Sequence, residues 1–388
     1  MKIFFASIGN PTAFIARRIQ ALKNENIEVL VDWDVTPPSL MGEQILEVAF
    51  KKPSWKRFYH LFFFPHFFLE SFKFLRKQCH YSWKNSFRKA LFLCEIARHK
   101  PHLVHVQWTN AARDFLPLQT LLGIPVLAAV RGTQLTTSPF ISENSKGILD
   151  QILKSITHFQ TVSLDLKDLL VKLGVDSRNI IQNYNGVNTD LFKNFNSRSK
   201  HIEQLEIIMV ARNYWSKCVE SAFFMLHELK KKQIPFRFTW VGVPPNDPLF
   251  KHWMDRLDLT NQVQLIDRLN STELVQRYNE SDVILSTSAA EGLANVILEA
   301  MATGCIPVVW KCEGMNEAIG KDGIGFIHAF GEISSMVSSL ESIYMNNEWR
   351  LRSSKACEER VVQHFNEKIH TGLMIQEYQN LLKLNQRK

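Results

Sequence analysis

The sequence lacks the patterns of a disulfide-stabilised, zinc-binding or membrane-spanning protein. Its six cysteines are scattered over 388 residues, with no Cys-x-x-Cys pair and no cysteine–histidine cluster at zinc-ligand spacing. No apolar run reaches the roughly 18 residues that a transmembrane helix needs. The first residues, MKIFFASIGN, predict a strand, and their apolar stretch is too short for a secretory signal. We therefore expect a cytoplasmic protein.

The composition is that of a globular protein with more than one domain. Hydrophobic residues make up 45% of the chain and charged residues 22%, which does not indicate disorder. At roughly 100–200 residues per domain, the length predicts two domains, each large enough for its own core.

Positive charge is concentrated in one part of the chain. Residues 51–100 hold twelve Lys or Arg residues and only Glu70 and Glu95 as acids, a net +10 in a chain of net +8. The same window holds ten of the 27 phenylalanines. This mixture is typical of nucleic-acid binding or of docking on an anionic membrane. No nucleic-acid motif accompanies it, so no nucleic-acid partner is expected.

Two interpretations of residues 51–100 stay open. In the first, the window docks the protein on the anionic inner face of the cell membrane, where each basic residue near the surface contributes about 1 kcal/mol of binding free energy. Alternatively, it forms two helices whose phenylalanines pack on the first domain.

Short apolar runs alternate with longer amphipathic ones, which predicts βα units on two parallel, doubly wound sheets. A polar stretch, KNFNSRSK at 193–200, is the expected linker. The expected strands are 3–7, 27–31, 103–106, 126–130 and 159–162, then 206–210, 236–241, 263–266, 283–286, 306–309 and 325–327. The expected helices are 12–23, 163–173, 216–232, 271–280 and 295–303, followed by mostly helix from residue 332.

The segment 286–309, STSAAEGLANVILEAMATGCIPVV, carries the densest chemical signal. A strand ends near Ser286, and a helix begins around 293–295. Free backbone N–H groups in that first turn, together with the helix dipole, form an anion site. Gly292 allows close approach of a ligand because it has no Cβ.

Two glutamates frame this helix start. A nucleotide sugar needs backbone amides for its diphosphate and carboxylates for its hydroxyls, and Glu291 and Glu299 stand at suitable positions. For either glutamate alone, a solvated helix residue is the ordinary interpretation. Glu299, however, lies within the apolar stretch VILEAMA, where an unpartnered carboxylate is costly.

This segment, EGLANVILEAMATGCIPVV, resembles the E-x7-E segment of family 4 glycosyltransferases (glycosyl transferases group 1). Further phrases resemble that family in the expected order: NGVNTDLF at 185–192, VARNYWSK at 210–217, WVG at 240–242 and GMNEAI at 314–319. The phrase at 263–274 departs from the family pattern, with Asp267 where glycine is usual. The resemblance is dense over 183–330 and thinner before it.

The resemblance implies the GT-B fold, in which two Rossmann-like α/β domains face a central cleft. The domains would be 1–195, which binds the acceptor, and 200–365, which binds the nucleotide sugar. The helices at about 366–388 would pack back on the first domain.

The resemblance also implies roles for individual residues. Arg212 and Lys217 would neutralise the leaving diphosphate, and fixed cations and amides would stabilise its charge in the transition state. Glu299 would bind ribose and Glu291 the transferred sugar. The backbone of Leu293, Ala294 and Asn295, with Gly292, would face the phosphates.

Candidates in the first half are fewer. Gly9 fits the family's glycine that admits the donor phosphates, although a simple strand-to-helix turn is equally consistent; its neighbour Asn10 is an acceptor-side candidate. Arg131 stands where many relatives have a histidine that contacts the reacting sugar. Arginine cannot act as a general base, but it can orient the sugar or stabilise phosphate. His105 is a second acceptor-side candidate, with a structural role as its ordinary interpretation.

No cofactor or metal is expected. The resemblance implies retention of anomeric configuration, in which the departing phosphate takes the acceptor proton and no strong side-chain base is needed. The acidic pair Asp32 and Asp34 lies far from the donor motif and is interpreted as a loop pair.

The sequence thus predicts a retaining glycosyltransferase, peripheral at the inner membrane face, that moves a sugar from a nucleoside diphosphate to a lipid-linked saccharide or polysaccharide precursor. Two rivals remain. One is a soluble enzyme of the same fold, such as a sugar-nucleotide epimerase or a sugar-phosphate synthase. The other is a non-catalytic sugar-nucleotide-binding scaffold, suggested by Arg131.

Overall fold

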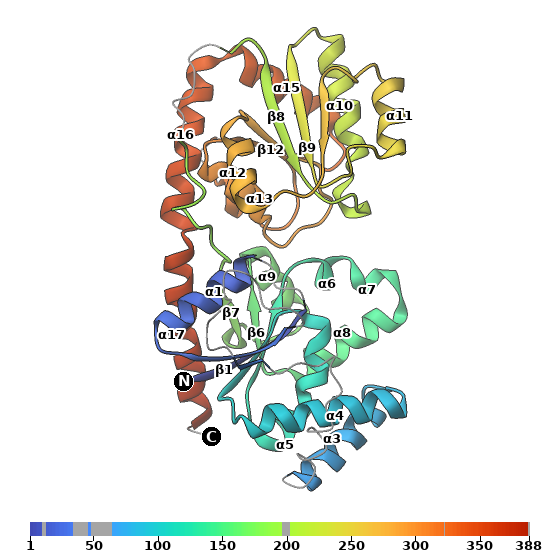
Figure 1. The fold of residues 1–388 in the computed structure, drawn as a ribbon, viewed down its shortest axis with the longest axis vertical. Coiled ribbons are helices and arrows are strands. Elements are labelled where there is room, and N and C mark those ends of the chain that lie inside the picture. The colour runs from blue at the N-terminus through green and yellow to red at the C-terminus, as the bar shows by residue number, and fades with distance from the viewer. Residues whose placement is uncertain (10–12, 34–45, 48–63, 196–201, 322, 387–388) are drawn as a thin grey trace. The chain divides into compact units, whose positions relative to one another are not determined.

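The computed structural model describes residues 1–9, 13–33, 46–47, 64–195, 202–321 and 323–386 (Figure 1). Contacts divide the chain into two compact units. The first unit comprises Met1–Tyr184 and His370–Lys388, and the second comprises Asn185–Ile369. Residues 196–200 of the expected linker lie outside the described residues, whereas 193–195 belong to the second unit.

The first unit is built on a seven-stranded sheet of order β3-β2-β1-β4-β5-β6-β7, whose described pairings are all parallel. The chain leaves β1 in one direction and returns through β4 in the other, as in doubly wound folds. The strands are β1 (Lys2–Gly9), β2 (Glu28–Trp33), β3 (Leu46–Glu47), β4 (Leu103–Val106), β5 (Val126–Val130), β6 (His158–Thr161) and β7 (Ile180–Gln182).

Helices connect these strands. They are α1 (Ala13–Asn24), α3 (Pro65–Lys77), α4 (Trp83–Arg98), the 3-10 helix η3 (Thr109–Phe115), α5 (Leu116–Leu122), α6 (Thr133–Thr136), α7 (Ser138–Ile141), α8 (Glu143–Ser155), α9 (Leu164–Lys172) and η4 (Ser177–Asn179). The last helix, α17 (Glu367–Gln386), begins in the second unit. Its later residues Met374, Tyr378 and Leu381 belong to the core that covers β1 and β2.

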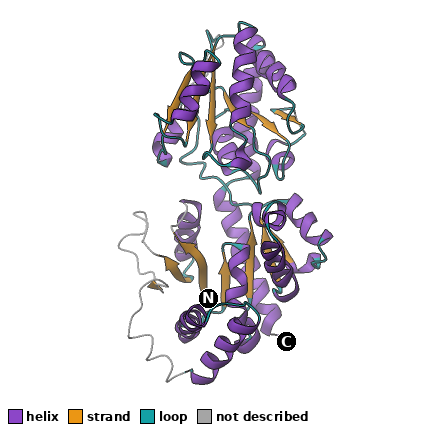
Figure 2. Cartoon of the chain, turned by 90° about the vertical axis from the view of Figure 1, so that its right-hand side faces the viewer, coloured by secondary structure: helices purple, strands orange, loops and turns teal. Residues whose placement is uncertain are grey.

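The second unit has a six-stranded parallel sheet of order β10-β9-β8-β11-β12-β13. Figure 2 shows helices on both faces of this sheet. Its strands are β8 (Leu205–Val210), β9 (Phe236–Val241), β10 (Val263–Ile266), β11 (Val283–Ser286), β12 (Ile306–Trp310) and β13 (Phe326–His328). Its helices are η5 (Trp215–Lys217), α10 (Glu220–Lys231), α11 (Pro248–Arg256), α12 (Ser271–Asn279), α13 (Asn295–Ala302), α14 (Met315–Ile319), α15 (Ile333–Met345) and α16 (Asn347–His364).

The predicted α/β fold of two doubly wound domains is confirmed, and the local sequence explains most element boundaries. The Ser163 hydroxyl accepts a hydrogen bond from the backbone N–H of Leu166 and caps α9. The expected helix 216–232 begins only at Glu220, because 215–217 form a 3-10 turn and Cys218 has φ +44°. Two short strands, β3 and β7, are not among the expected ones; two or three residues are too few to show a periodic pattern.

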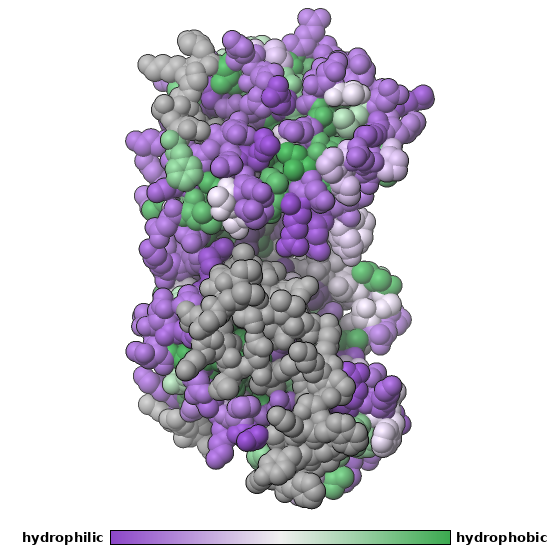
Figure 3. All heavy atoms as spheres, viewed as in Figure 1, coloured by the Kyte–Doolittle hydropathy of each residue, from purple (hydrophilic) through white to green (hydrophobic). Residues whose placement is uncertain are grey.

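Each unit has the buried core that a sheet covered on both faces requires. In the second unit Phe223, Trp240 and Phe250 are fully buried, and the Trp240 and Phe250 ring centroids lie 4.5 Å apart. Hydrophilic residues cover most of this unit's face in Figure 3, with isolated hydrophobic side chains between them.

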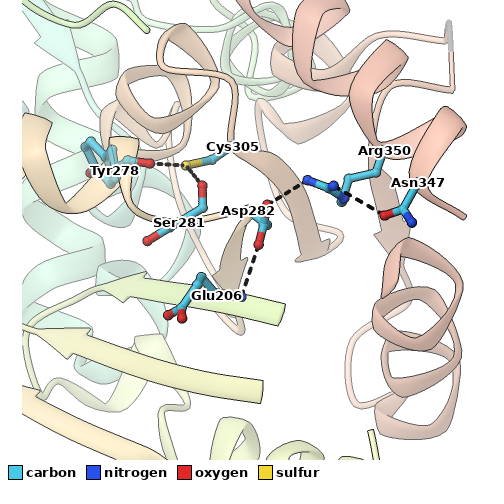
Figure 4. A network of polar contacts seen from close by, with 7 residues as sticks. All are labelled: Glu206, Tyr278, Ser281, Asp282, Cys305, Asn347 and Arg350. Carbon is cyan, nitrogen blue, oxygen red and sulfur yellow. Dashed lines mark hydrogen bonds and ion pairs between the residues drawn. The ribbon is translucent and has the colours of Figure 1, made fainter. Parts of the chain in front are cut away.

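A buried ion pair ties α16 to the sheet of the second unit (Figure 4). Arg350 Nη1 lies 2.9 Å from Asp282 Oδ1, and both residues are buried. Asp282 also accepts the backbone N–H of Glu206 at 3.2 Å, and Arg350 Nη2 donates to Asn347 Oδ1 at 3.3 Å. Asp282 directly precedes β11, so this network fixes the strand that leads into the predicted donor segment.

We predict that Arg350→Met destabilises the protein by about 3–5 kcal/mol, because it leaves the Asp282 carboxylate buried without its cation. The double variant Arg350→Met/Asp282→Asn should recover part of this loss. Urea denaturation monitored by tryptophan fluorescence measures both. The matched control is Lys232→Met, which removes the exposed Lys232–Glu341 pair and should cost less than about 1 kcal/mol. Equal effects of the buried and the exposed substitution would contradict the prediction.

Candidate functional site

The predicted donor segment lies in the second unit as a loop between β11 and α13. The N-cap residue of α13 is Ala294, which provides no side-chain cap, so the first amides of the helix donate to no capping side chain. Helix ends of this kind attract anions. Leu293 and Ala294 are buried, and Asn295 Oδ1 accepts a hydrogen bond from Asn185 Nδ2 at 3.4 Å.

This loop is fastened to the turn that carries Lys217. The backbone N–H of Ala289 donates to Ser216 O at 2.8 Å, and Thr287 Oγ1 donates to Lys217 O at 2.8 Å. The two predicted segments, 210–217 and 286–295, are thus joined by hydrogen bonds on both sides of Ser288. The side chains of Lys217 and Glu291 are held by this shared framework.

Two glycines allow the close approaches that shape the loop. Gly314, at φ +78°, would place a Cβ 2.6 Å from Gly292 O. Gly242, at φ +117°, would place one 2.5 Å from Ala211 O, which also accepts Trp240 Nε1 at 2.8 Å. Any side chain at either position would displace the backbone on which the site residues stand.

Lys217 and Glu291 form an ion pair in this framework. Their side chains are only 22% and 15% exposed. Both line a small, partly open pocket between the ends of β8 and β11 and the start of α13. The structure therefore brings together two of the residues that the sequence singled out.

The other donor-side candidates lie around this pair. Arg212, two residues after β8, is exposed. Glu299 is half-buried on α13, and its charge adds to burial in raising the pKa of Tyr278 well above its ordinary value. Gly292, which is buried, follows Glu291 directly.

In the first unit, His105 belongs to the interior. It lies within β4, is fully buried, and its Nδ1 is 2.7 Å from the Tyr378 hydroxyl oxygen of α17. Burial, and then the charges of Arg18 and Arg131, hold its pKa well below the ordinary value. A neutral, enclosed imidazole bonded to a helix favours the structural interpretation of this histidine.

Arg131 follows β5 directly and is half-buried. Its Nε donates to Gln107 O at 3.0 Å and its Nη2 to Gln107 Oε1 at 2.6 Å. The guanidinium carbon also lies 5.9 Å from the centroid of the Trp108 ring. Burial, reinforced by Arg18, lowers the pKa of Arg131 to about 9, so the side chain remains a cation at neutral pH.

The sequence did not single out Gln107. The signal that points to it is its place directly after β4, since the carboxyl ends of neighbouring parallel strands meet at one edge of a sheet. Gly9 ends β1, and Asn10 and Asp34 lie outside the described residues. Among the described residues, no group of three or more His, Cys, Asp or Glu side chains is arranged to hold a metal ion.

Comparisons with known proteins identify the class. Residues 192–360 match the model of the family described as glycosyl transferases group 1. The whole chain resembles a sucrose-phosphate synthase from Thermosynechococcus elongatus, with TM-score 0.75, 14% identity and 99% coverage of both chains. It resembles Anabaena HepE in complex with UDP and glucose, with TM-score 0.76 and 16% identity over 98% of this chain and 100% of that one.

A glycosyltransferase from Rickettsia africae matches with TM-score 0.72 and 19% identity over 98% of both chains. No curated protein sequence matches the chain. The chain thus shares the GT-B fold of these solved structures. Its residues 192–360 match the model of the glycosyl transferases group 1, which confirms the resemblance found in the sequence.

The buried neutral His105 generates a pH prediction. Its pKa is below about 6.5 in the folded state and near that value in the unfolded state, so below about pH 6.5 the unfolded chain binds a proton that the folded one does not. The contribution of His105 to the free energy of unfolding is therefore fully present above about pH 6.5 and is lost as the pH falls below that value.

The free energy of unfolding, measured by urea denaturation, should therefore fall between about pH 7.5 and about pH 5.5. The fall should be about 1 kcal/mol larger for the wild type than for His105→Asn. Asparagine is the chosen replacement because its amide also bonds a tyrosine hydroxyl but does not titrate. An identical pH dependence of the two proteins would contradict this account.

Proposed function

We propose that the protein is a retaining glycosyltransferase that moves a sugar from a nucleoside diphosphate sugar to a saccharide, and specifically to a lipid-linked saccharide or polysaccharide precursor. The observation that carries the donor half of this proposal is the Lys217–Glu291 ion pair in the wall of the pocket at the start of α13. It combines a cation for phosphate with a carboxylate for sugar hydroxyls at one place.

The leaving diphosphate accounts for the cations around this pocket. Breaking the glycosyl–phosphate bond leaves charge on phosphate oxygens, which Lys217, Arg212 and the first amides of α13 would stabilise. Glu299, farther along the helix, would accept hydrogen bonds from ribose. The structures of HepE with UDP and with UDP-glucose support a nucleotide-sugar donor here as well.

The ion pair also suggests how the donor enters. Lys217 and Glu291 satisfy each other's charge. A nucleotide sugar would separate them, since its diphosphate binds Lys217 while a sugar hydroxyl donates to Glu291. The diphosphate and the sugar together would then replace the Lys217–Glu291 ion pair. The pocket would therefore bind the intact nucleotide sugar in preference to the free nucleotide, which has no sugar for Glu291.

Arg131 is consistent with a retaining reaction. In that reaction the departing phosphate takes the proton of the acceptor hydroxyl, so a permanently charged side chain serves better for orientation than as a base. We propose no metal and no organic cofactor, because lysine, arginine and backbone amides provide the charge stabilisation for which other enzymes use a cation.

A membrane-bound acceptor is favoured by the surface of α3 and α4. The phenylalanines Phe67, Phe68 and Phe92 are buried, as the packing interpretation of this window requires. The cations remain outside, however, and Trp83 is 62% exposed, with its ring stacked on Phe87 at 5.3 Å. We name this surface the α3–α4 basic face; its exposed cations are Lys73, Arg76, Lys77, Lys84 and Arg88.

An exposed tryptophan among cations suits the interface of an anionic bilayer, so we propose peripheral attachment at the cytoplasmic membrane face. Residues 51–63 of the basic window lie outside the described residues. No helix in the described part of the chain is both long and apolar enough to cross a bilayer.

The alternative with a specific observation behind it is a sugar-phosphate synthase, since a sucrose-phosphate synthase shares the fold. Acceptor assays separate the two functions. Transfer to a soluble sugar phosphate, with no transfer to lipid-linked saccharides, would favour the synthase.

Donor binding gives the first prediction for this function. In thermal-shift screening against nucleotide sugars, the matching donor at 100 times its dissociation constant should stabilise the protein by about 2.7 kcal/mol. Lys217→Met should reduce transfer by about 10²-fold or more. No response to any nucleotide sugar would overturn the proposal, and equally slow nucleotide release by the wild type and Glu299→Ala would favour a scaffold.

Glu291→Gln makes a sharper test of the ion pair. It should abolish most transfer yet bind the free nucleoside diphosphate about fivefold more tightly, because a partly exposed ion pair worth up to about 1 kcal/mol no longer competes for Lys217. The matched control, Glu341→Gln, breaks the Lys232–Glu341 pair of the same unit and should change neither property. Weaker nucleotide binding by Glu291→Gln would contradict the exchange of partners.

Membrane docking is tested by co-sedimentation with vesicles that contain anionic phosphatidylglycerol. The triple variant Lys77→Glu/Lys84→Glu/Arg88→Glu should bind at least about 100-fold more weakly, at about 1 kcal/mol per basic residue. The control, Lys146→Glu/Lys154→Glu/Lys172→Glu, changes the net charge equally at exposed lysines elsewhere in the first unit. Equal binding of both variants, or binding to uncharged vesicles, would exclude the α3–α4 basic face as the docking surface.

A further inference from the structure

Gln107 holds Arg131 at two points. Its backbone oxygen accepts from Nε at 3.0 Å and its side-chain Oε1 accepts from Nη2 at 2.6 Å. Two acceptors from one residue fix both the position and the plane of a guanidinium group. Without such contacts an arginine side chain carries about 2 kcal/mol of rotamer entropy.

Gln107 is itself firmly placed. It is 1% exposed, its backbone N–H donates to Ala6 O at 3.0 Å, and its Nε2 donates to His105 O at 3.3 Å. It therefore extends the pairing of β1 with β4 by one residue. The contact to Arg131 then crosses from the end of β4 to the end of β5, its parallel neighbour.

The chemistry of this contact differs from that of the buried Arg350–Asp282 pair. Arg350 is held by the Asp282 carboxylate, which neutralises it. Gln107 offers only uncharged oxygens, so it orients Arg131 without cancelling its charge. The nearby Arg18, which lowers the pKa of Arg131 and of His105, shows that the surroundings are electropositive.

An oriented cation at the carboxyl edge of a doubly wound sheet stands where ligands of such folds bind. In these half-buried surroundings its charge acts more strongly than it would in water. An oriented guanidinium recognises phosphate oxygens in particular, because its N–H groups match their geometry.

We propose that Gln107 is a positioning residue for transfer: it presents the Arg131 guanidinium, still charged, to a phosphate group of the substrates. This inference rests on the proposed function, in which Arg131 takes part. The sources of that phosphate are the nucleotide donor and the anionic linkage of a lipid-linked acceptor, and the assay distinguishes them.

The competing explanation is that Gln107 only joins two strand ends. Thr109 provides a matched control for it. The Thr109 side chain is as buried as that of Gln107, and its Oγ1 donates to Ala129 O at 2.8 Å, so it also links the chain after β4 to β5. This hydrogen bond does not involve Arg131, and Thr109→Val removes it while keeping the shape of the side chain.

The first experiment compares kcat, KM and Tm of Gln107→Met, Gln107→Glu and Thr109→Val. We expect Gln107→Met to keep a Tm near that of Thr109→Val but to lose about 10²-fold in transfer, the effect of a misplaced site group. Thr109→Val should keep its kcat. A rise in KM for the donor assigns the phosphate to the nucleotide, and a rise for the acceptor assigns it to the acceptor.

Gln107→Glu separates orientation from charge. Its carboxylate keeps the side-chain acceptor of Arg131 Nη2 and adds a negative charge beside it, but it cannot donate to His105 O as Nε2 does. The Tm of Gln107→Glu should therefore lie near that of Gln107→Met, while transfer stays about 10-fold or more below the wild type. Full activity of Gln107→Glu, or losses of activity that follow Tm across all three variants, would overturn the proposal.

An NMR measurement tests the positioning without any substrate. The Arg131 Nη2–H signal, assigned by its absence in Arg131→Lys, should exchange slowly with water in the wild type and in Gln107→Glu and rapidly in Gln107→Met, because only Gln107→Met removes the side-chain oxygen to which Nη2 donates. Slow exchange in Gln107→Met would overturn the positioning by Gln107. If positioning holds but the wild type transfers no sugar from any donor, the assignment of Arg131 to glycosyl transfer fails instead.

Discussion

All described pairings in both sheets are parallel, and this constraint brings Gln107 near Arg131 and Arg212 near the loop with Glu291. Parallel strands end at one edge of their sheet, so residues that are far apart in sequence but follow different strands lie at the same edge. Gln107 and Arg131 follow β4 and β5 in the first unit. Arg212 and the loop with Glu291 follow β8 and β11 in the second. Hydrogen bonds between the connecting segments then fix the side chains.

Three polar contacts show how burial and charge divide structural from functional roles. Arg350 and Asp282 are buried and oppositely charged, which makes their contact a permanent part of the second unit. Lys217 and Glu291 are also oppositely charged but remain partly exposed beside a pocket, so a charged ligand can replace either partner. Arg131 donates to two uncharged oxygens of Gln107, a contact that orients the guanidinium group without cancelling its charge.

The basic, phenylalanine-rich window illustrates why composition alone left two interpretations. The buried phenylalanines agree with the packing interpretation, and membrane docking stays a proposal; the two do not exclude each other, because the two faces of a helix are independent. Phe67 and Phe68 face the interior, whereas Lys77, Lys84 and Arg88 are exposed around Trp83. Local periodicity predicts that two faces exist; which residues the rest of the unit covers depends on contacts with α5 and the sheet, which no local pattern encodes.

The sequence by itself determined the α/β class, most of the strands, the helix start near Asn295 and the glycosyltransferase resemblance. Those features depend on hydrophobic periodicity, capping and short motifs, which act over a few residues. Only the tertiary structure decided that His105 is enclosed against Tyr378, that Lys217 pairs with Glu291, and that Gln107 holds Arg131. These contacts join residues 24 to 273 positions apart, and side-chain partners at such separations are set by strand order and helix packing. The donor segment was therefore recognisable from the sequence, whereas the contacts that orient Arg131 are seen only in the tertiary structure.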